Sequence, residues 1–211
     1  MVYKSEKFWN KLSKNYDKNG KDKAYNLIIE KSKKYFKPDD VILDFACATG
    51  LYSFVFSTYV KEIQAFDISS KMIEIAKSKA KRKEVDHVIF SQTTLFDKKY
   101  KEASFDVILG FNILLYFKDE KEVLSRMNKL LKTGGLIITS TACLKERRTC
   151  IGILSSSLIF LFKSLRILPY LKFYKIRALE KTITNYGFKI IETDILIDKP
   201  ATEYFIVAQK L

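Results

Sequence analysis

Short apolar runs recur along the chain and alternate with amphipathic segments. The runs are rich in β-branched and aromatic residues and are bounded by charged or turn residues, a pattern typical of buried strands. We predict five strands on this basis, over residues 41–45, 63–66, 87–90, 105–109 and 136–140.

The segments between these strands predict helices. Residues 70–83 carry apolar side chains on one face and lysines elsewhere, with Ser69 or Ser70 placed to cap the N-terminus. Residues 119–131 repeat this helical spacing, and we expect residues 133–135, Thr-Gly-Gly, to form the turn that separates this helix from the next strand.

The alternation predicts an α/β fold: a three-layer, Rossmann-like doubly wound sheet that is mostly parallel, with helices on both faces. After a helix expected at residues 176–186, two closing strands are predicted at residues 189–195 and 203–209, paired antiparallel across the turn at residues 198–200. We therefore expect about seven strands, with an antiparallel last strand.

Length and composition favour one domain. A chain of 211 residues with 47% hydrophobic residues is large enough for a single core, and seven glycines and three prolines leave little room for linkers. We expect one domain over residues 1–211, in which residues 1–36 form N-terminal helices before the sheet.

The chain is strongly basic. Lys and Arg number 38 against 24 Asp and Glu, a formal charge of +14. Such a field attracts anionic partners, whether nucleic acid, acidic lipid headgroups or phosphorylated metabolites, and does not choose among them. The abundance of Lys, Ile, Phe, Tyr and Asn is also what A·T-rich codon usage produces, which explains much of the charge.

Cysteine and histidine usage argues against a metal site. Cys47, Cys143 and Cys150 form no CxxC pair, and the single His87 completes no cluster with metal-ligand spacing. The odd number of cysteines, and a charged segment at residues 1–10 without an apolar signal core, predict a cytoplasmic location.

The most informative stretch is VILDFACATG at residues 41–50. A buried strand ends near Asp44 and continues into small residues, which let a ligand approach the backbone, before a helix with unpaired N–H groups. Asp67 ends the second strand, 17 residues after Gly50, where a carboxylate can accept hydrogen bonds from both hydroxyls of a ribose. The pair of carboxylates predicts an adenosine ligand.

Together with Met72 and the stretches QTTLFD at 92–97 and SFDVILGFN at 104–112, this pair resembles the ordered motifs of class I methyltransferases that use S-adenosylmethionine (SAM). The chain looks most like the methyltransferase 11/25-type domain of the ubiquinone/menaquinone C-methyltransferase branch. Residues 8–17, FWNKLSKNYD, are similar to the helix with a closing Tyr-Asp before the core of that branch. LLKTGG at 130–135 is similar to its LLKPGG turn.

The resemblance implies a role for each matching position. Asp44 would meet the methionine amino group of SAM, and Asp67 would hold the ribose. Ala46, Ala48 and Gly50 would line the methionine end. The other cofactor-contacting positions would be Ile68, Met72, Thr94 and Leu95 around the adenine, Phe111 and Asn112 near the sulfonium, and Tyr16 from the N-terminal helix.

Two departures from the family pattern concern the loop and the acceptor side. Gly is usual where Ala48 stands, and a positive φ there would cost Ala up to ~1–2 kcal/mol. His often stands where Leu115 and Tyr116 are found, so one candidate base is absent. Methyl transfer from a sulfonium is an in-line displacement that depends on alignment, and we expect Tyr16, Asn112 and Tyr116 to face the acceptor.

Residues 144–175 are expected to form a helical, acceptor-binding lid after the fifth strand. Residues 149–162 carry no charge and are flanked by basic residues. This run is shorter than the ~20 residues of a membrane span, but it fits peripheral contact with an anionic membrane and a lipid-like acceptor. Glu146 is a further candidate to reach the site.

We thus predict a SAM-dependent methyltransferase with a small-molecule or lipid-like acceptor. Two alternatives stay open: an RNA or protein methyltransferase that uses the positive charge, and a non-catalytic SAM-fold protein that binds a ligand or partner. A nucleic-acid substrate is disfavoured because we find neither an appended RNA-binding module nor an Asn/Asp-Pro-Pro-Tyr motif. The sequence carries no signal for an oligomeric state.

Overall fold

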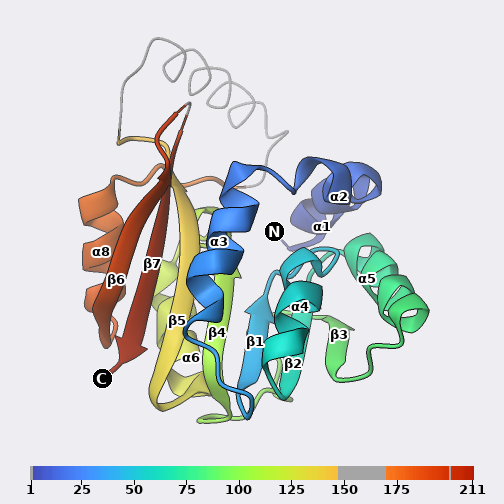
Figure 1. Cartoon of the computed structure of the whole chain (residues 1–211). Coiled ribbons are helices and arrows are strands. Elements are labelled where there is room, and N and C mark those ends of the chain that lie inside the picture. The colour runs from blue at the N-terminus through green and yellow to red at the C-terminus, as the bar shows by residue number, and fades with distance from the viewer. Residues whose placement is uncertain (1, 147–169, 200) are drawn as a thin grey trace.

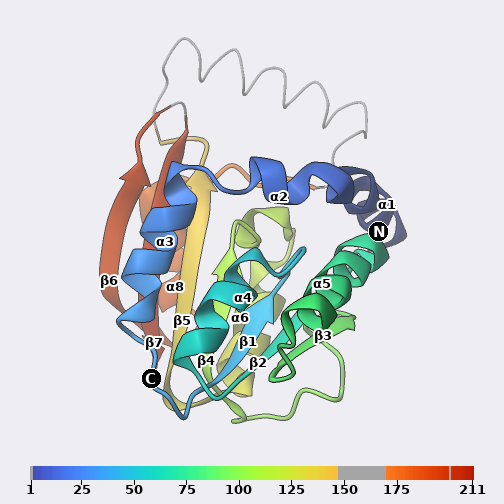
Figure 2. The ribbon, with the colours of Figure 1, turned by 45° about the vertical axis from the view of Figure 1, so that its right-hand side comes forward.

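The computed structural model describes residues 2–146, 170–199 and 201–211. In this part of the chain, seven strands form one sheet in the order β3-β2-β1-β4-β5-β7-β6, which confirms the predicted α/β fold. Helices cover both faces of the sheet (Figures 1 and 2). One face carries α3 (Lys23–Lys33), α4 (Leu51–Phe56) and α5 (Ser70–Lys83), and the other carries α6 (Glu120–Leu130) and α8 (Ile176–Thr184).

Five strands run parallel and two close the sheet. The parallel strands are β1 (Val41–Phe45), β2 (Glu62–Asp67), β3 (Val88–Gln92), β4 (Phe105–Phe111) and β5 (Leu131–Cys143). The last strand, β7 (Thr202–Lys210), is antiparallel to both β5 and β6 (Phe188–Ile197), as predicted. Because β1 pairs with β2 on one side and β4 on the other, the strand order reverses at β1, and such a switch point opens a crevice at the carboxyl ends of the strands.

The start of β5 differs from the prediction. The helix ends at Leu130, but Leu131 is already extended and pairs with Phe105, so the strand begins five residues earlier than expected. Gly134 takes a φ of +74° inside the strand, and a side chain on Gly135 would lie 3.0 Å from a backbone oxygen of the neighbouring strand. The glycines are thus an irregularity within β5 and not a turn before it.

The core lies in two layers, one on each face of the sheet. Neighbouring residues of a strand point to opposite faces, and Ile42 and Leu43 of β1 are both fully buried, one in each layer. The layer under α6 and α8 includes Leu124 and Leu179, and the layer under α4 and α5 includes Phe56. The central strands are therefore covered on both faces, which leaves their ends open to a ligand.

The N-terminal segment crosses those strand ends. It consists of α1 (Val2–Leu12), a 3-10 turn (Ser13–Asn15) and the short α2 (Tyr16–Asn19). Both views place α1 and α2 over the carboxyl ends of the parallel strands (Figures 1 and 2). Side chains from this segment are therefore within reach of the switch point.

The predicted lid falls mainly on residues 147–169, which lie outside the described residues, as does the uncharged stretch within them. On either side of this range, Lys145 N donates to Tyr174 O at 3.0 Å and Lys172 N donates to Leu115 O at 2.7 Å. Among the helices of the described ranges, none is long and apolar enough to cross a bilayer.

Candidate functional site

Asp44 lies near the end of β1 and is 3% exposed. Its carboxylate accepts a hydrogen bond from the Ser53 hydroxyl on α4. Burial raises the pKa of Asp44 to about 7, the Ser53 hydroxyl opposes the rise, and the nearby Asp67 adds to it. A buried carboxylate with a single donor is prepared to bind a cation.

The loop after β1 is held in a left-handed conformation at alternate residues. Ala46, Ala48 and Gly50 have φ values of +60°, +50° and +78°. The positive φ expected at Ala48 is thus present, and an alanine in this region costs ~1–2 kcal/mol. A side chain on Gly50 would meet the Phe90 ring at 2.7 Å, so the third position tolerates glycine alone.

Asp67 connects this loop to the start of α5. One carboxylate oxygen accepts from Ala48 N at 3.0 Å, and the other accepts from Ser69 N at 2.8 Å. Burial raises the pKa of Asp67 to about 6, against the lowering effect of these backbone donors. The structure therefore brings Asp44 and Asp67 to the ends of adjacent strands, with the loop between them.

A cavity of about 320 Å³ opens at the carboxyl ends of β1 and β4, beside the amino end of the antiparallel β7. Five of the predicted site residues line it: Tyr16, Asp44, Ala46, Phe111 and Asn112. Burial raises the pKa of Tyr16, and Asp67, Tyr116 and Asp44 raise it further, so its hydroxyl keeps its proton and serves as a hydrogen-bond donor.

Asn112 has a more specific role than the sequence predicted. Its backbone has a φ of +52°. Its side-chain oxygen accepts from Ala142 N at 3.0 Å, and its amide nitrogen donates to Glu203 Oε1 at 2.9 Å. Both polar ends of the amide are therefore engaged by the protein, and Asn112 orients Glu203.

Glu203 is a cavity residue that the sequence analysis missed. It lies on β7, is 8% exposed and also accepts from the Ser140 hydroxyl. Burial raises its pKa to about 7, while the Asn112 amide opposes the rise and Asp22 adds to it. The available signal was a lone charge within the apolar run at residues 202–208, since a charge in a buried strand needs a partner or a function.

The remaining predicted residues lie outside the cavity lining. Tyr116 is half-buried, meets the Trp9 ring of α1 edge-on at 5.3 Å and acts electrostatically on the cavity residue Tyr16, although it does not itself line the cavity. Glu146 accepts from Ile176 N at the start of α8, 2.7 Å away. Glu146 thus caps a helix and is not one of the residues that line the cavity.

The residues predicted around the adenine lie at the ends of β2 and β3. Met72 is 1% and Leu95 is 2% exposed, and Leu95 belongs to the core layer under α6. Ile68 and Thr94 are half-buried. In this structure the adenine side is a packed region in which Leu95 acts as a core residue.

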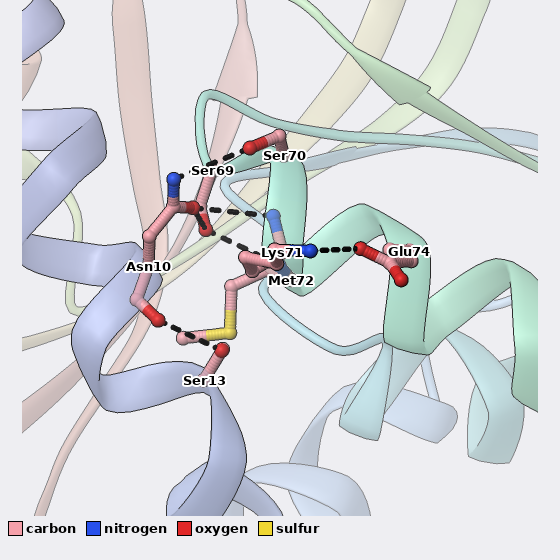
Figure 3. A network of polar contacts seen from close by, with 7 residues as sticks. All are labelled: Asn10, Ser13, Ser69, Ser70, Lys71, Met72 and Glu74. Atoms are coloured by element: carbon pink, nitrogen blue, oxygen red, sulfur yellow. Dashed lines mark hydrogen bonds and ion pairs between the residues drawn. The ribbon is translucent and has the colours of Figure 1, made fainter.

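Helix α1 covers this side through Asn10, a second residue that the sequence analysis missed (Figure 3). Asn10 Oδ1 accepts from Ser69 Oγ at 2.6 Å and from Lys71 N at 3.1 Å, and its amide donates to Ser70 Oγ at 3.2 Å. Asn10 thereby caps α5 from a different element. Only its position in the family-like segment at residues 8–17 gave a hint.

Asp17 supplies the second connection of the N-terminal segment. It accepts from the Thr49 hydroxyl in the loop after β1, and it pairs with Lys79 Nζ on α5 at 2.8 Å. The segment therefore bridges the two elements that flank the pair of carboxylates.

These features suit one kind of ligand. Within the described ranges no cluster of three or more His, Cys, Asp or Glu side chains is arranged to hold a metal ion. A buried carboxylate at the cavity fits an ammonium group, and small residues with positive φ leave the backbone approachable. Asp67 keeps acceptor capacity for ribose hydroxyls, because each carboxylate oxygen can accept more than one hydrogen bond. The residues present therefore fit SAM.

The strand order with an antiparallel β7, and the carboxylates at the ends of β1 and β2, define the class: a Rossmann-like fold of the SAM-dependent methyltransferase type. The model of a methyltransferase domain family matches residues 36–165, more than half of the chain. The chain belongs to this methyltransferase family, whose methyl donor is SAM.

The chain is similar to curated relatives, and it shares its fold with solved structures. The uncharacterised protein MJ1252 of Methanocaldococcus jannaschii is 25% identical over 205 residues, covering 89% of this chain and 77% of that protein. The demethylmenaquinone methyltransferase of Lactococcus lactis is 28% identical over 177 residues, covering 79% and 67%. The structure of geranyl diphosphate C-methyltransferase from Streptomyces coelicolor, solved with Mg²⁺, geranyl diphosphate and S-adenosylhomocysteine (SAH), has a TM-score of 0.71 at 13% identity, covering 89% and 78%.

Proposed function

We propose that this protein transfers a methyl group from SAM to a small-molecule or lipid-like acceptor held in the cavity at the ends of β1, β4 and β7. The observation that carries the proposal is Asp44, a buried carboxylate that lines the cavity beside a loop in positive φ.

We assign the holding residues by position. Asp44 binds the methionine ammonium and Asp67 the ribose, with Ala46, Ala48 and Gly50 along the methionine end. Bound SAM supplies a methyl carbon on a positively charged sulfur. The assignment of Phe111 and Asn112 to the sulfonium, and of Ile68, Met72, Thr94 and Leu95 to the adenine, completes the proposed set.

The protein contributes alignment and exclusion of water. Tyr16 and Tyr52 line the cavity together with Phe111, and burial raises the pKa of both tyrosines, so both stay neutral. Aromatic side chains together with fixed polar groups orient an acceptor for in-line attack, and such alignment supplies up to ~7–11 kcal/mol of acceleration.

The size of the cavity favours a small acceptor over a macromolecule. A cavity of about 320 Å³ is within the range of small-molecule sites. The names of two similar proteins, demethylmenaquinone methyltransferase and geranyl diphosphate C-methyltransferase, describe small or lipid-like acceptors for those proteins, which supports the same class here.

Calorimetric titration with SAM and with SAH tests the cofactor site. We expect both to bind with one-to-one stoichiometry. If neither compound binds, the proposed function is wrong. The better interpretation is then a non-catalytic binding protein with this fold.

Labelled SAM tests the acceptor class. The protein is incubated with a desalted cell lysate and SAM labelled in its methyl group, and the lysate is then separated into small molecules, lipids, RNA and protein. We expect the label in the small-molecule or lipid fraction. Label that enters mainly RNA or protein would replace the proposed acceptor class.

A lipid-like acceptor also implies contact with an anionic membrane. Sedimentation with liposomes checks this: we expect more protein on anionic than on neutral vesicles, falling as salt rises. Equal partitioning on the two kinds of vesicle would remove the membrane from the proposal.

A further inference from the structure

The cavity is acidic although the chain is basic. Asp22, Asp44 and Glu203 line it, and none of the described residues that line it is Lys or Arg, against a formal charge of +14 for the whole chain. Asp44 is assigned to the methionine ammonium of SAM. Two carboxylates are left for whatever else enters the cavity.

Glu203 presents one unused oxygen. Asn112 and Ser140 both donate to Oε1, and no donor among the described residues bonds Oε2. Oε2 is also not one of the fully enclosed side-chain polar atoms that lack a hydrogen bond, a group that includes Ser32 Oγ, Tyr174 OH and Thr202 Oγ1. Because Glu203 lines the cavity and is 8% exposed, its accessible oxygen faces the cavity.

The surroundings of Glu203 favour a cation. Asp22 lies at the N-terminus of α3, where it accepts from Tyr25 N at 3.0 Å, and its charge acts on Glu203. The rings of Tyr52 and Phe111 line the same cavity with their centroids 4.5 Å apart. Carboxylates beside aromatic faces are the groups that recognise ammonium ions.

Building on the proposed function, we propose that the acceptor presents a protonated amine to Glu203 and Asp22, and that Glu203 is the catalytic base that takes its proton. The ammonium N–H bond breaks and the proton moves to Glu203 Oε2, which turns the carboxylate into a carboxylic acid. The freed nitrogen pair forms the bond to the methyl carbon, and the carbon–sulfur pair stays on sulfur. The products are a methylated ammonium and SAH.

An alcohol acceptor fits this site less well. One carboxylate suffices to receive a hydroxyl proton, and a neutral hydroxyl gains no ion pair from the second. A protonated amine must both be bound as a cation and lose a proton before it can attack. The two carboxylates serve those two needs.

Sinefungin tests the position of Glu203 without turnover. This SAM analogue carries an amine-bearing carbon in place of the methyl-bearing sulfur, so its extra ammonium points where the methyl group would be, whereas SAH has no group there. We expect the wild type to bind sinefungin more tightly than SAH. Glu203→Gln should lose about 10- to 100-fold of sinefungin affinity, as expected for one charged hydrogen bond, and keep SAH affinity.

Glu203→Gln retains an oxygen that accepts from Asn112 and Ser140, so the fold should survive. Glu180→Gln is the matched control: it makes the same change on α8, where Glu180 accepts from the Tyr204 hydroxyl outside the cavity lining. It should leave the sinefungin-to-SAH ratio unchanged. Asp22→Asn, which keeps a good helix cap, should lower the ratio by less than Glu203→Gln.

The outcomes separate the two proposals. If the wild type binds neither SAH nor sinefungin, the proposed function fails. If SAH binds and Glu203→Gln leaves the sinefungin-to-SAH ratio unchanged, the role of Glu203 is overturned while the proposed function stands.

The dependence of the sinefungin-to-SAH affinity ratio on pH gives a second test of Glu203. The titratable groups that interact with Glu203 are Asp22, whose charge raises the pKa of Glu203, and Tyr52 and Cys143, which burial keeps neutral. Since burial raises the pKa of Glu203 to about 7, the preference for sinefungin should be present above pH 7 and lost as Glu203 gains a proton below it. Titration of Asp44 should change the affinity for both compounds equally, because both carry the methionine ammonium. Its effect therefore cancels in the sinefungin-to-SAH affinity ratio. A ratio that stays flat with pH in the wild type counts against Glu203.

Small aromatic probes test the acceptor class on the SAH complex. Binding of benzylammonium, benzyl alcohol and benzoate is followed by ligand-observed NMR. We expect the order benzylammonium, then benzyl alcohol, then benzoate, with the first preference lost in Glu203→Gln. Equal or weaker binding of benzylammonium overturns the amine acceptor.

Discussion

The two halves of the site are built differently. The half at the ends of β1, β4 and β7 is a cavity, lined by Asp44 and Glu203, in which charged groups are buried with few partners. The half at the ends of β2 and β3 is packed, with Asp67 bonded to two backbone N–H groups and Asn10 capping the helix beside it. The first half therefore contains open volume and buried carboxylates, whereas the second half is closed by packing and hydrogen bonds.

The difference indicates that the two halves contribute differently to ligand binding. Buried carboxylates with few hydrogen-bond donors lower the stability of the folded protein, and binding of a cation offsets this loss. Under the proposed assignment, a nucleoside at the covered half would lie beside the contacts that Asn10 of α1 makes with the start of α5. We therefore expect charge changes to act through the cavity half, and changes in the N-terminal segment to act on entry and release at the covered half.

The largest effect is expected when Asp67 is substituted. Asp67→Ala should lower SAH affinity by about 100-fold or more, since two charged hydrogen bonds to the ribose are lost at ~1.5–3 kcal/mol each. It should also lower the free energy of unfolding by ~1–3 kcal/mol, because Ala48 N and Ser69 N lose their acceptor. Calorimetry and urea denaturation measure the two effects. Asp86→Ala, at a fully exposed carboxylate, is the control, and equal SAH affinity in both variants would refute the ribose assignment.

The next effect is a dependence of stability on pH through Asp44. Its pKa in the folded protein, about 7, lies above the ordinary 3.8, so the folded state holds the proton more tightly than the unfolded state. The stabilisation is fully present below about pH 4 and is lost as pH rises through 7. Asp67 and Glu203, whose pKa values are also raised, act in the same direction.

Urea denaturation between pH 5 and pH 8 measures this dependence. We expect the free energy of unfolding of the ligand-free protein to fall over this range, by about 3 kcal/mol through Asp44 and by a further amount through Asp67 and Glu203. Asp44→Asn should flatten the slope, and Asp86→Asn should not. SAH should flatten it as well, because its ammonium stabilises the charged form of Asp44. An unchanged slope in Asp44→Asn would show that other groups carry the titration.

A smaller effect is expected at the covered half. Asn10→Ala removes the acceptor for Lys71 N and Ser69 Oγ, which should lower the free energy of unfolding by ~1 kcal/mol, the usual cost of a lost helix cap. It should also speed the release of SAH, measured by stopped-flow fluorescence. Asn15→Ala changes an exposed residue of the same segment that makes no capping bond. If both variants release SAH at the wild-type rate, α1 does not control access.

The smallest effect is expected in the loop that joins the two halves. Ala48→Gly removes the strain of a φ of +50° and should raise the free energy of unfolding by up to ~1 kcal/mol. Ala103→Gly, also at a φ of +50° but in the turn before β4, should stabilise the protein similarly. Only Ala48→Gly should change SAH affinity, and an equal change in both would mean that the loop strain is unrelated to binding.

Local pattern was sufficient for the parts of the protein whose partners are near in the sequence. Helix α5 was predicted at residues 70–83 and is observed at Ser70–Lys83, because its apolar face and its Ser69 cap are both local. That Asp44 and Asp67 lie close together was also predictable, since consecutive parallel strands place their carboxyl ends at the same edge of the sheet.

Tertiary packing decided the rest. Strand β5 begins at Leu131 because that residue pairs with Phe105 of another strand, which overrides the turn preference of two glycines. Glu203 reaches the cavity because β7 runs antiparallel beside β5, and it meets Asn112, which lies 91 residues away. Asn10 caps a helix that begins 60 residues later. Hydrogen bonds of this span depend on where whole elements dock, and periodicity within one element carries no information about that.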